Sequence, residues 1–189
     1  NQLLQKLNGR LYLIQGNHDH YVKDPNFDSS RFEWIKMYEE LSDNKRKVIL
    51  CHYPIMCYNG QYKLNAEGNP KTYMLYGHVH DTQDQRLLER FQGITSETTF
   101  LNTQGETQHI PCNMINCFCM YSNYQPLTLD EWIACDKNRK QKSCQNVKRY
   151  EKEPSKTGRL KVFIVVYDFL GMSTVPSVSI KDRIASEFC

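Results

Sequence analysis

The strands predicted for this chain are short apolar runs that end at a turn residue. They cover residues 10–15 ("RLYLIQ"), 46–54 ("RKVILCHYP") and 71–77 ("KTYMLYG"). Gly16 follows the first run, and Pro54 closes the second. Runs of this length that are bounded by glycine or proline are typical of strands buried in a sheet.

Three other stretches carry the pattern of helices. In one of them, Phe32, Ile35 and Tyr38 recur at helical spacing after a pair of serines that can cap a helix. In another, Thr128 precedes two acidic residues, which is a pattern that starts helices. The predicted helices are residues 29–43, residues 84–92 and a helix that covers residues 128–133.

Predicted strands and helices alternate along most of the chain, and a further strand with a turn is predicted at 112–124. This order is typical of an α/β protein built as a layered αβ sandwich. We therefore expect one domain over residues 1–134, after which the composition becomes basic. Residues 161–189 are expected to be an extra C-terminal segment of unknown role, and 159–170 is another strand-like run.

The basic character of the chain is local. Residues 136–161 hold ten Lys and Arg and three Asp and Glu, a net charge of +7 in a chain of net charge +3, so the remainder carries −4. We interpret residues 135–160 as a solvated basic linker. Contact with nucleic acid is the alternative. Tyr150 is the one aromatic residue of this stretch, which gives little support for stacking on bases.

Cysteine usage and hydropathy favour a cytoplasmic protein. None of the eight cysteines forms a C-x-x-C pair, and the N-terminal residues lack the pattern of a secretion signal. We interpret the cysteines as mostly reduced thiols. The alternative is a soft-metal site formed by Cys112, Cys117, Cys119 and Cys135. No apolar run approaches the roughly 18 residues that cross a bilayer, so no membrane partner is expected.

Most of the six histidines lie just beyond the ends of the three predicted strands. The stretches concerned are "LIQGNHDH" (13–20), "ILCHYP" (49–54) and "MLYGHVH" (74–80). Ligand sites of open α/β sheets lie at the carboxyl edge of the strands, so these polar clusters are expected to converge. Neutral imidazole nitrogens bind divalent transition metals, and the Asn17 side chain adds an oxygen ligand. The pattern therefore predicts a metal site.

The sequence resembles the calcineurin-like metallophosphoesterase family in three motifs, which occur in the order of that family. They are G-N-H-D at 16–19, H-Y-P at 52–54 and G-H-V-H at 77–80. The resemblance covers residues 1–134 and implies the layered αβ sandwich of that family. It also implies a metal-dependent hydrolase of phosphate esters. Two divalent cations (Mn, Fe, Zn or Ni) would activate a hydroxide for in-line attack.

The resemblance assigns roles to the motif residues. His18 matches the histidine that contacts the scissile phosphate and protonates the leaving oxygen, and Asp19 matches the carboxylate that holds its imidazole. Asp19 in place of Glu leans towards phosphodiesters over phosphomonoesters. The residues that match metal ligands are Asn17, His52 and His78 for one cation and His80 for the other.

The substrate is expected to meet the polar loop 57–72, in which Tyr58 and Tyr62 are compatible with stacking on a base. That reading makes a nucleotide or a nucleic acid a candidate substrate. A plain surface loop explains the same composition equally well.

The first two motifs of the family, D-x-H and G-D, do not occur upstream of Gly16 in this sequence. We therefore expect the chain to begin within the fold, without its first strands, and to carry only part of the dimetal site. A circular permutation through Asp168 is not favoured, because the histidine that it requires is missing. The alternatives are a non-catalytic phosphoesterase remnant that acts as a binding module, and a nucleic-acid-binding module led by the basic segment.

Overall fold

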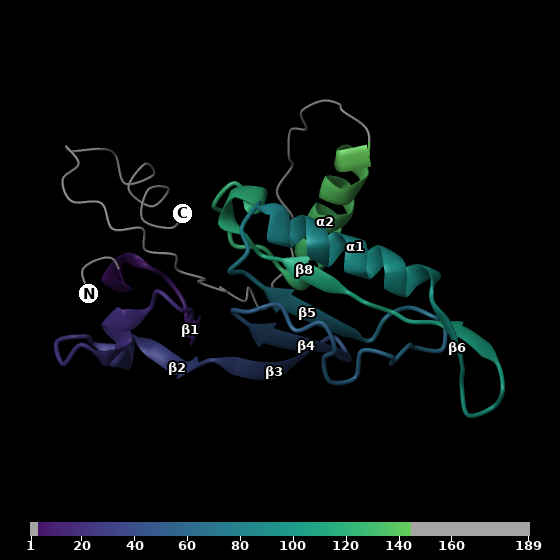
Figure 1. Ribbon diagram of the computed structural model, residues 1–189. Helices are drawn as coiled ribbons and strands as arrows, with labels where there is room; N and C mark the ends of the chain where they lie inside the picture. Colours follow the sequence, from purple (N-terminus) through teal and green to yellow (C-terminus); the bar gives the residue numbers. More distant parts are fainter. Residues whose placement is uncertain (1–3, 145–189) are drawn as a thin grey trace.

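The computed structural model describes residues 4–144 of the chain, which form an α/β arrangement of open sheets and helices (Figure 1). The elements in chain order are η1 (Leu4–Lys6), β1 (Leu11–Ile14), η2 (His20–Lys23), η3 (Ser29–Arg31), β2 (Phe32–Lys36), β3 (Tyr38–Asp43), β4 (Arg46–Cys51), β5 (Thr72–Tyr76), α1 (Gln83–Glu97), β6 (Thr99–Leu101), β7 (Thr107–His109), β8 (Met114–Asn116), η4 (Cys119–Ser122) and α2 (Leu129–Cys144).

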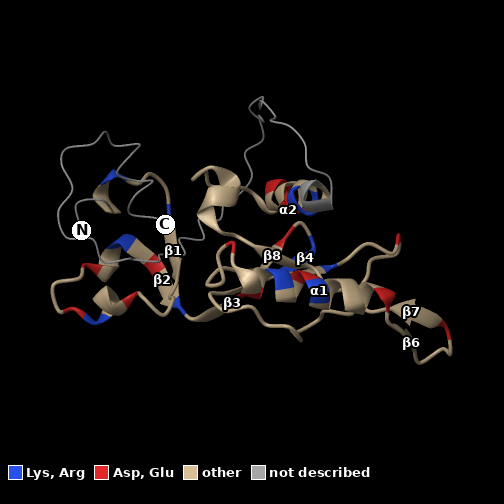
Figure 2. Ribbon diagram, turned by 45° about the horizontal axis from the view of Figure 1, so that its top comes forward, with Lys and Arg blue, Asp and Glu red and all other residues tan. Residues whose placement is uncertain are grey.

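The central sheet has the strand order β3-β4-β5-β8. β4, β5 and β8 are parallel, so their carboxyl ends lie at one edge, and β3 is antiparallel to β4. Alternate residues of these strands enter two different cores. Leu50 and its neighbours pack with Trp132 of α2, whereas Ile49 and its neighbours pack with Leu88 of α1. The two helices therefore cover opposite faces of the sheet (Figure 2).

An extended run joins this sheet to the smaller sheet of β1 and β2. β2 pairs in parallel with β1, with Ile14 opposite Lys36, and β3 pairs with β4, with Tyr38 opposite Cys51. Met37 alone separates β2 from β3. The carboxyl ends of β1 and β4 therefore meet the same run at nearly the same point, although the two strands belong to different sheets.

The prediction of a helix over residues 29–43 is wrong. The structure has a short 3-10 turn at Ser29–Arg31, followed by strands β2 and β3. The aromatic and β-branched side chains of this segment favour strands, and pairing with β1 and β4 outweighs the helical spacing. Phe32 is buried in a third core with Leu11 and Leu13 of β1.

The other predicted elements of this region are confirmed. The strands expected at 10–15, 46–54 and 71–77 are β1, β4 and β5, and the helix expected at 84–92 is α1. The segment 112–124 contains β8 and a 3-10 turn. One connection was not anticipated, the turn between β3 and β4, where Asn44 and Lys45 have positive φ values of 49° and 63°. Two left-handed residues between paired strands form the tight hairpin whose twist matches that of the strands.

Helix α2 crosses the domain boundary that was expected at residue 134. It starts in a capping box, in which the Thr128 hydroxyl accepts from the Glu131 N–H and the Glu131 carboxylate accepts from the Thr128 N–H. It then continues to Cys144. Residues 135–144 are therefore helical and do not form a linker. The remainder of the expected linker 135–160 and the segment 161–189 lie outside the described residues.

Basic side chains of α2 are neutralised by acidic neighbours. Arg139 forms ion pairs with Glu89 of α1 and with Asp136, and Lys140 pairs with Asp136. These pairs anchor the helix and explain why it extends into the basic stretch. None of the helices within residues 4–144 is long and apolar enough to cross a bilayer.

The stability of the hairpin of β3 and β4 should depend on pH through the carboxylate of Glu40. Hydrogen bonds from Lys47, Tyr38 and Asn59 lower the pKa of Glu40 from 4.5 to about 2. Because the pKa in the folded state is lower than in the unfolded state, the resulting stability is present above about pH 4.5 and is lost as the pH falls towards 2.

Glu40→Gln should therefore lower the free energy of unfolding near neutral pH, with a difference from wild type that shrinks between pH 4.5 and 2. Urea unfolding over this pH range measures it. Glu67→Gln, at an exposed position in the loop after β4, is the control. A constant difference across the range would contradict the assignment.

Candidate metal centre

Three polar side chains from the ends of three strands meet in a triangle. Asn17 follows β1, His52 follows β4 and His78 follows β5. His52 Nε2 lies 2.6 Å from Asn17 Oδ1 and 3.1 Å from His78 Nδ1. The third side, from His78 Nδ1 to Asn17 Oδ1, is 3.0 Å. The structure thus brings together the three residues that the sequence assigned to one cation.

The triangle reaches from the interior to the surface. His52 is fully buried, Asn17 is half-buried and His78 is exposed. Gly16 packs against the His52 ring so closely that a Cβ at this position would lie 2.8 Å from ring atoms Cε1 and Nδ1. The absence of a side chain at Gly16 is therefore what lets the turn after β1 bring Asn17 onto the imidazole.

Hydrogen bonds alone do not satisfy this triangle. Towards its neighbours, each of the three atoms acts either as a donor or as an acceptor. With three groups in mutual contact, at least one pair must then be two donors or two acceptors, whichever tautomers and amide orientation are chosen. A cation that accepts all three lone pairs removes this conflict.

The spacing of the three atoms also suits a cation. Two ligand atoms bonded at about 2.0–2.2 Å lie about 3 Å apart at an octahedral angle and about 3.4 Å apart at a tetrahedral angle. The sides of 3.0 and 3.1 Å are close to the octahedral value, and the side of 2.6 Å is shorter. Two borderline imidazoles and one hard amide oxygen form a neutral set in which nitrogen predominates, which suits a transition metal better than Ca²⁺ or Mg²⁺.

The loop that carries His78 and His80 is strained. His78 has φ 67° and His80 has φ 47°, both in the left-handed region. A non-glycine residue in this region costs about 1–3 kcal/mol, and such strain is concentrated at functional sites. The loop is fixed to the neighbouring motif by a hydrogen bond of 3.0 Å from the Gly77 N–H to the His52 carbonyl.

Tyr53 borders the triangle. Its ring is edge-on to His52 at 5.0 Å and to His78 at 4.6 Å between centroids, and the residue is 41% exposed. Its ring therefore contacts both imidazoles of the triangle, the buried His52 and the exposed His78.

The other predicted site residues lie on the same two loops as Asn17 and His78. The His80 ring stacks on Phe118, with centroids 4.9 Å apart. His18 is exposed in the turn after β1. Asp19 is buried, and its Oδ2 accepts a hydrogen bond of 2.6 Å from the Gly16 N–H, so it fixes the turn that presents Asn17. Its support of the His18 imidazole stays a prediction.

One expected substrate contact needs correction. Tyr58 is 6% exposed and its hydroxyl accepts from the Asn113 N–H, so it belongs to the core and is not available for stacking on a base. Tyr62 is 55% exposed and packs edge-on against Phe100 of β6. Of the two tyrosines, only Tyr62 presents a ring face to solvent.

The cysteines do not form a metal site in the part of the chain that the structure describes. Six cysteines are thiols outside any disulfide: Cys51, Cys57, Cys112, Cys117, Cys119 and Cys135. Burial raises the pKa of Cys112 and Cys117. Among residues 4–144, no group of three or more His, Cys, Asp or Glu is arranged to hold a metal ion. The triangle contains two histidines and an amide, and therefore differs from such a group.

Sequence reasoning missed the polar residues that support the histidine loop. The side chain of Asn116, at the end of β8, donates to the His80 carbonyl, and Gln85 of α1 accepts from Asn116. The one signal for Asn116 was a polar residue inside the apolar run "CNMINCF".

Comparisons of the chain with protein-family models, with curated proteins and with solved structures returned no match. The support for a function therefore comes from the motifs and from the geometry of the site.

Gly16→Ala tests the packing on which the triangle depends. The added Cβ would meet the His52 ring at 2.8 Å, so we expect the ring to move and the free energy of unfolding to fall by about 1–3 kcal/mol. Chemical denaturation and the NMR shifts of the His52 imidazole measure the two effects.

Gly93→Ala is the matched control. Gly93 lies inside α1, and a Cβ there would have no atom within 4 Å, so the change should stabilise the protein by about 0.5–1 kcal/mol. If both glycine variants raised stability and left the His52 signals in place, the close packing of Gly16 on His52 would be wrong.

Proposed function

We propose that this chain is a domain of a metal-dependent hydrolase of phosphate esters, with the layered αβ sandwich of the calcineurin-like metallophosphoesterases. The observation that carries the proposal is the convergence of Asn17, His52 and His78 within 3.1 Å of one another. The family motifs assign the same three residues to one metal. The geometry supports this assignment, because it brings the three side chains within ligand distance of one another.

In this proposal, the triangle holds one divalent cation, for which Mn, Fe, Zn and Ni are the candidates. His80 is the candidate ligand of a second cation. The His80 ring stacks on Phe118. To bind a cation, His80 would either leave this position or use a nitrogen at the edge of the stacked ring. The triangle is therefore the stronger of the two sites, and it should fill first.

Bound divalent cations neutralise phosphate oxygens and make hydroxide available at neutral pH. The protein side chains then supply positioning and a proton. His18 is exposed beside Asn17, where it can donate a proton to the leaving alcohol oxygen as the P–O bond breaks. Tyr53, which is exposed and contacts both imidazoles, is the nearest aromatic ring for the ester to meet. Phosphodiesters are the favoured substrates, and a nucleotide or a nucleic acid is a candidate.

A second candidate function is a one-cation binding domain without catalysis. The stacking of the His80 ring on Phe118, which engages the candidate ligand of the second cation, favours this alternative. A basic nucleic-acid-binding surface has less support within residues 4–144, because Arg139 and Lys140 are engaged in ion pairs.

Loss of a triangle residue should remove the first cation. In Asn17→Ala, His52→Ala and His78→Ala, a three-ligand site becomes a two-ligand site, and we expect at least about a 10-fold loss of Mn²⁺ affinity. His109→Ala is the matched control, since His109 is exposed at the end of β7. Calorimetric titration measures the affinity. Equal Mn²⁺ binding by all four variants would reject the site.

His18→Ala separates catalysis from binding. We expect unchanged Mn²⁺ affinity and a loss of about 10²–10⁴-fold in turnover of bis-p-nitrophenyl phosphate, because a general acid is removed. The neighbouring His20→Ala, at the start of η2, should leave both quantities unchanged. Absence of turnover in the Mn²⁺-loaded wild type would favour the one-cation binding domain.

A further inference from the structure

The carbonyl of left-handed His80 is held by a buried side chain from another strand. Asn116 Nδ2 donates to the His80 carbonyl over 2.8 Å. Asn116 is 2% exposed and lies at the end of β8, next to β5 in the sheet. The contact therefore links a strained residue of the candidate site to the rigid edge of the sheet.

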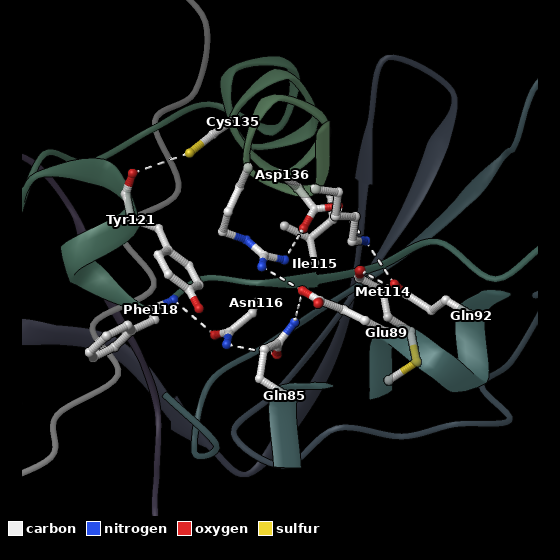
Figure 3. Close-up of polar contacts among 12 residues, drawn as sticks. Gln85, Glu89, Gln92, Met114, Ile115, Asn116, Phe118, Tyr121, Cys135 and Asp136 are labelled. Atoms are coloured by element: carbon white, nitrogen blue, oxygen red, sulfur yellow. Dashed lines mark hydrogen bonds and ion pairs between the residues drawn. The ribbon is translucent and has the colours of Figure 1, made fainter. Parts of the chain in front are cut away.

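The hydrogen-bonding groups of Asn116 are all used, and this fixes its orientation. Its Oδ1 accepts from the Phe118 N–H at 3.0 Å, and its Nδ2 also donates to Gln85 Oε1 at 2.9 Å (Figure 3). Reversing the amide would place oxygen against the His80 carbonyl and nitrogen against the Phe118 N–H. The two backbone partners therefore admit one orientation, in which a donor faces the loop.

Gln85 connects this contact to both helices. It is 2% exposed, and its Oε1 also accepts from the Tyr76 hydroxyl at 2.9 Å. Its Nε2 donates to Glu89 at 2.9 Å, and Glu89 pairs with Arg139 of α2 (Figure 3). A buried network that is satisfied at every step is rigid, because the movement of one member leaves another without its partner.

Asn116 contacts the loop at one of its two left-handed residues. His78 and His80 both have left-handed φ values, and only Val79 separates them. Val79 is buried, and its carbonyl accepts from the Thr82 hydroxyl at 2.7 Å. The Gly77 N–H holds the other end of the loop to His52. The loop is therefore fixed on both sides of His78, and Asn116 holds the side that follows it.

We propose that Asn116 is a positioning residue of the site, which holds the His80 carbonyl and thereby keeps the His78 imidazole in the triangle. The expected effect of Asn116 on cation affinity rests on the proposed function. Its hold on the loop is a property of the metal-free protein and can be measured separately.

The test compares Asn116→Ala with Gln92→Ala. Gln92 also links α1 to β8, since its Nε2 donates to the Met114 carbonyl at 2.7 Å, but it does not contact the histidine loop (Figure 3). Three quantities are measured: urea unfolding without metal, the ¹⁵N shifts of the histidine imidazoles without metal, and the Mn²⁺ affinity. Asn116→Asp is the second variant. It keeps the size and the acceptor towards Phe118 but lacks the donor to His80.

Both alanine variants should unfold at lower urea concentration than wild type. The Asn116 variants alone should shift the His78 and His80 imidazole signals and weaken Mn²⁺ binding by about 10- to 100-fold, as outer ligand supports do. Wild-type signals and affinity in both Asn116 variants would overturn the proposal. Shifted imidazoles in a protein whose wild type binds no Mn²⁺ would support the positioning role and refute the proposed function.

Discussion

The candidate site depends on the extended run of residues 32–43, which joins the two sheets. Its first half pairs with β1 and its second half with β4, and Met37 alone separates the two. This pairing places the carboxyl ends of β1 and β4 at one point, so Asn17 and His52 meet although their strands share no sheet. The parallel pairing of β4 with β5 then adds His78. Backbone hydrogen bonds, rather than the polar contacts themselves, thus set the position of the triangle.

The chemistry of the triangle follows from the hydrogen-bonding capacity of its three groups. Three groups in mutual contact cannot all be paired by hydrogen bonds, so the arrangement favours a species that accepts three lone pairs. The surrounding fold contributes rigidity in two ways. Gly16 allows backbone to lie directly on the His52 ring, and the network of Gln85 and Asn116 holds the left-handed loop after β5. In a site preorganised in this way, the free-energy cost of ordering side chains on ligand binding is smaller.

The sequence was sufficient for the parts of the fold in which local pattern and tertiary environment agree. β1, β4 and β5 are apolar runs bounded by turn residues, and they are also buried strands. The polar residues that follow them converge as expected, although β1 belongs to a different sheet from β4 and β5. Residues 29–43 show the opposite case, because Phe32, Ile35 and Tyr38 fit a helical spacing while strand pairing with distant segments decided the outcome. Asn116 was missed because its importance comes from a contact with His80, 36 positions earlier in the chain.

The most direct test of the account is a crystal structure of the protein soaked in Mn²⁺, with an anomalous difference map recorded at the manganese edge. We predict one strong peak bonded to Asn17 Oδ1, His52 Nε2 and His78 Nδ1, at bond lengths of about 2.0–2.2 Å. These atoms are the expected ligands because they are the ones that face one another. A map without a peak at the triangle, or with manganese bound only at other side chains, would contradict the central claim.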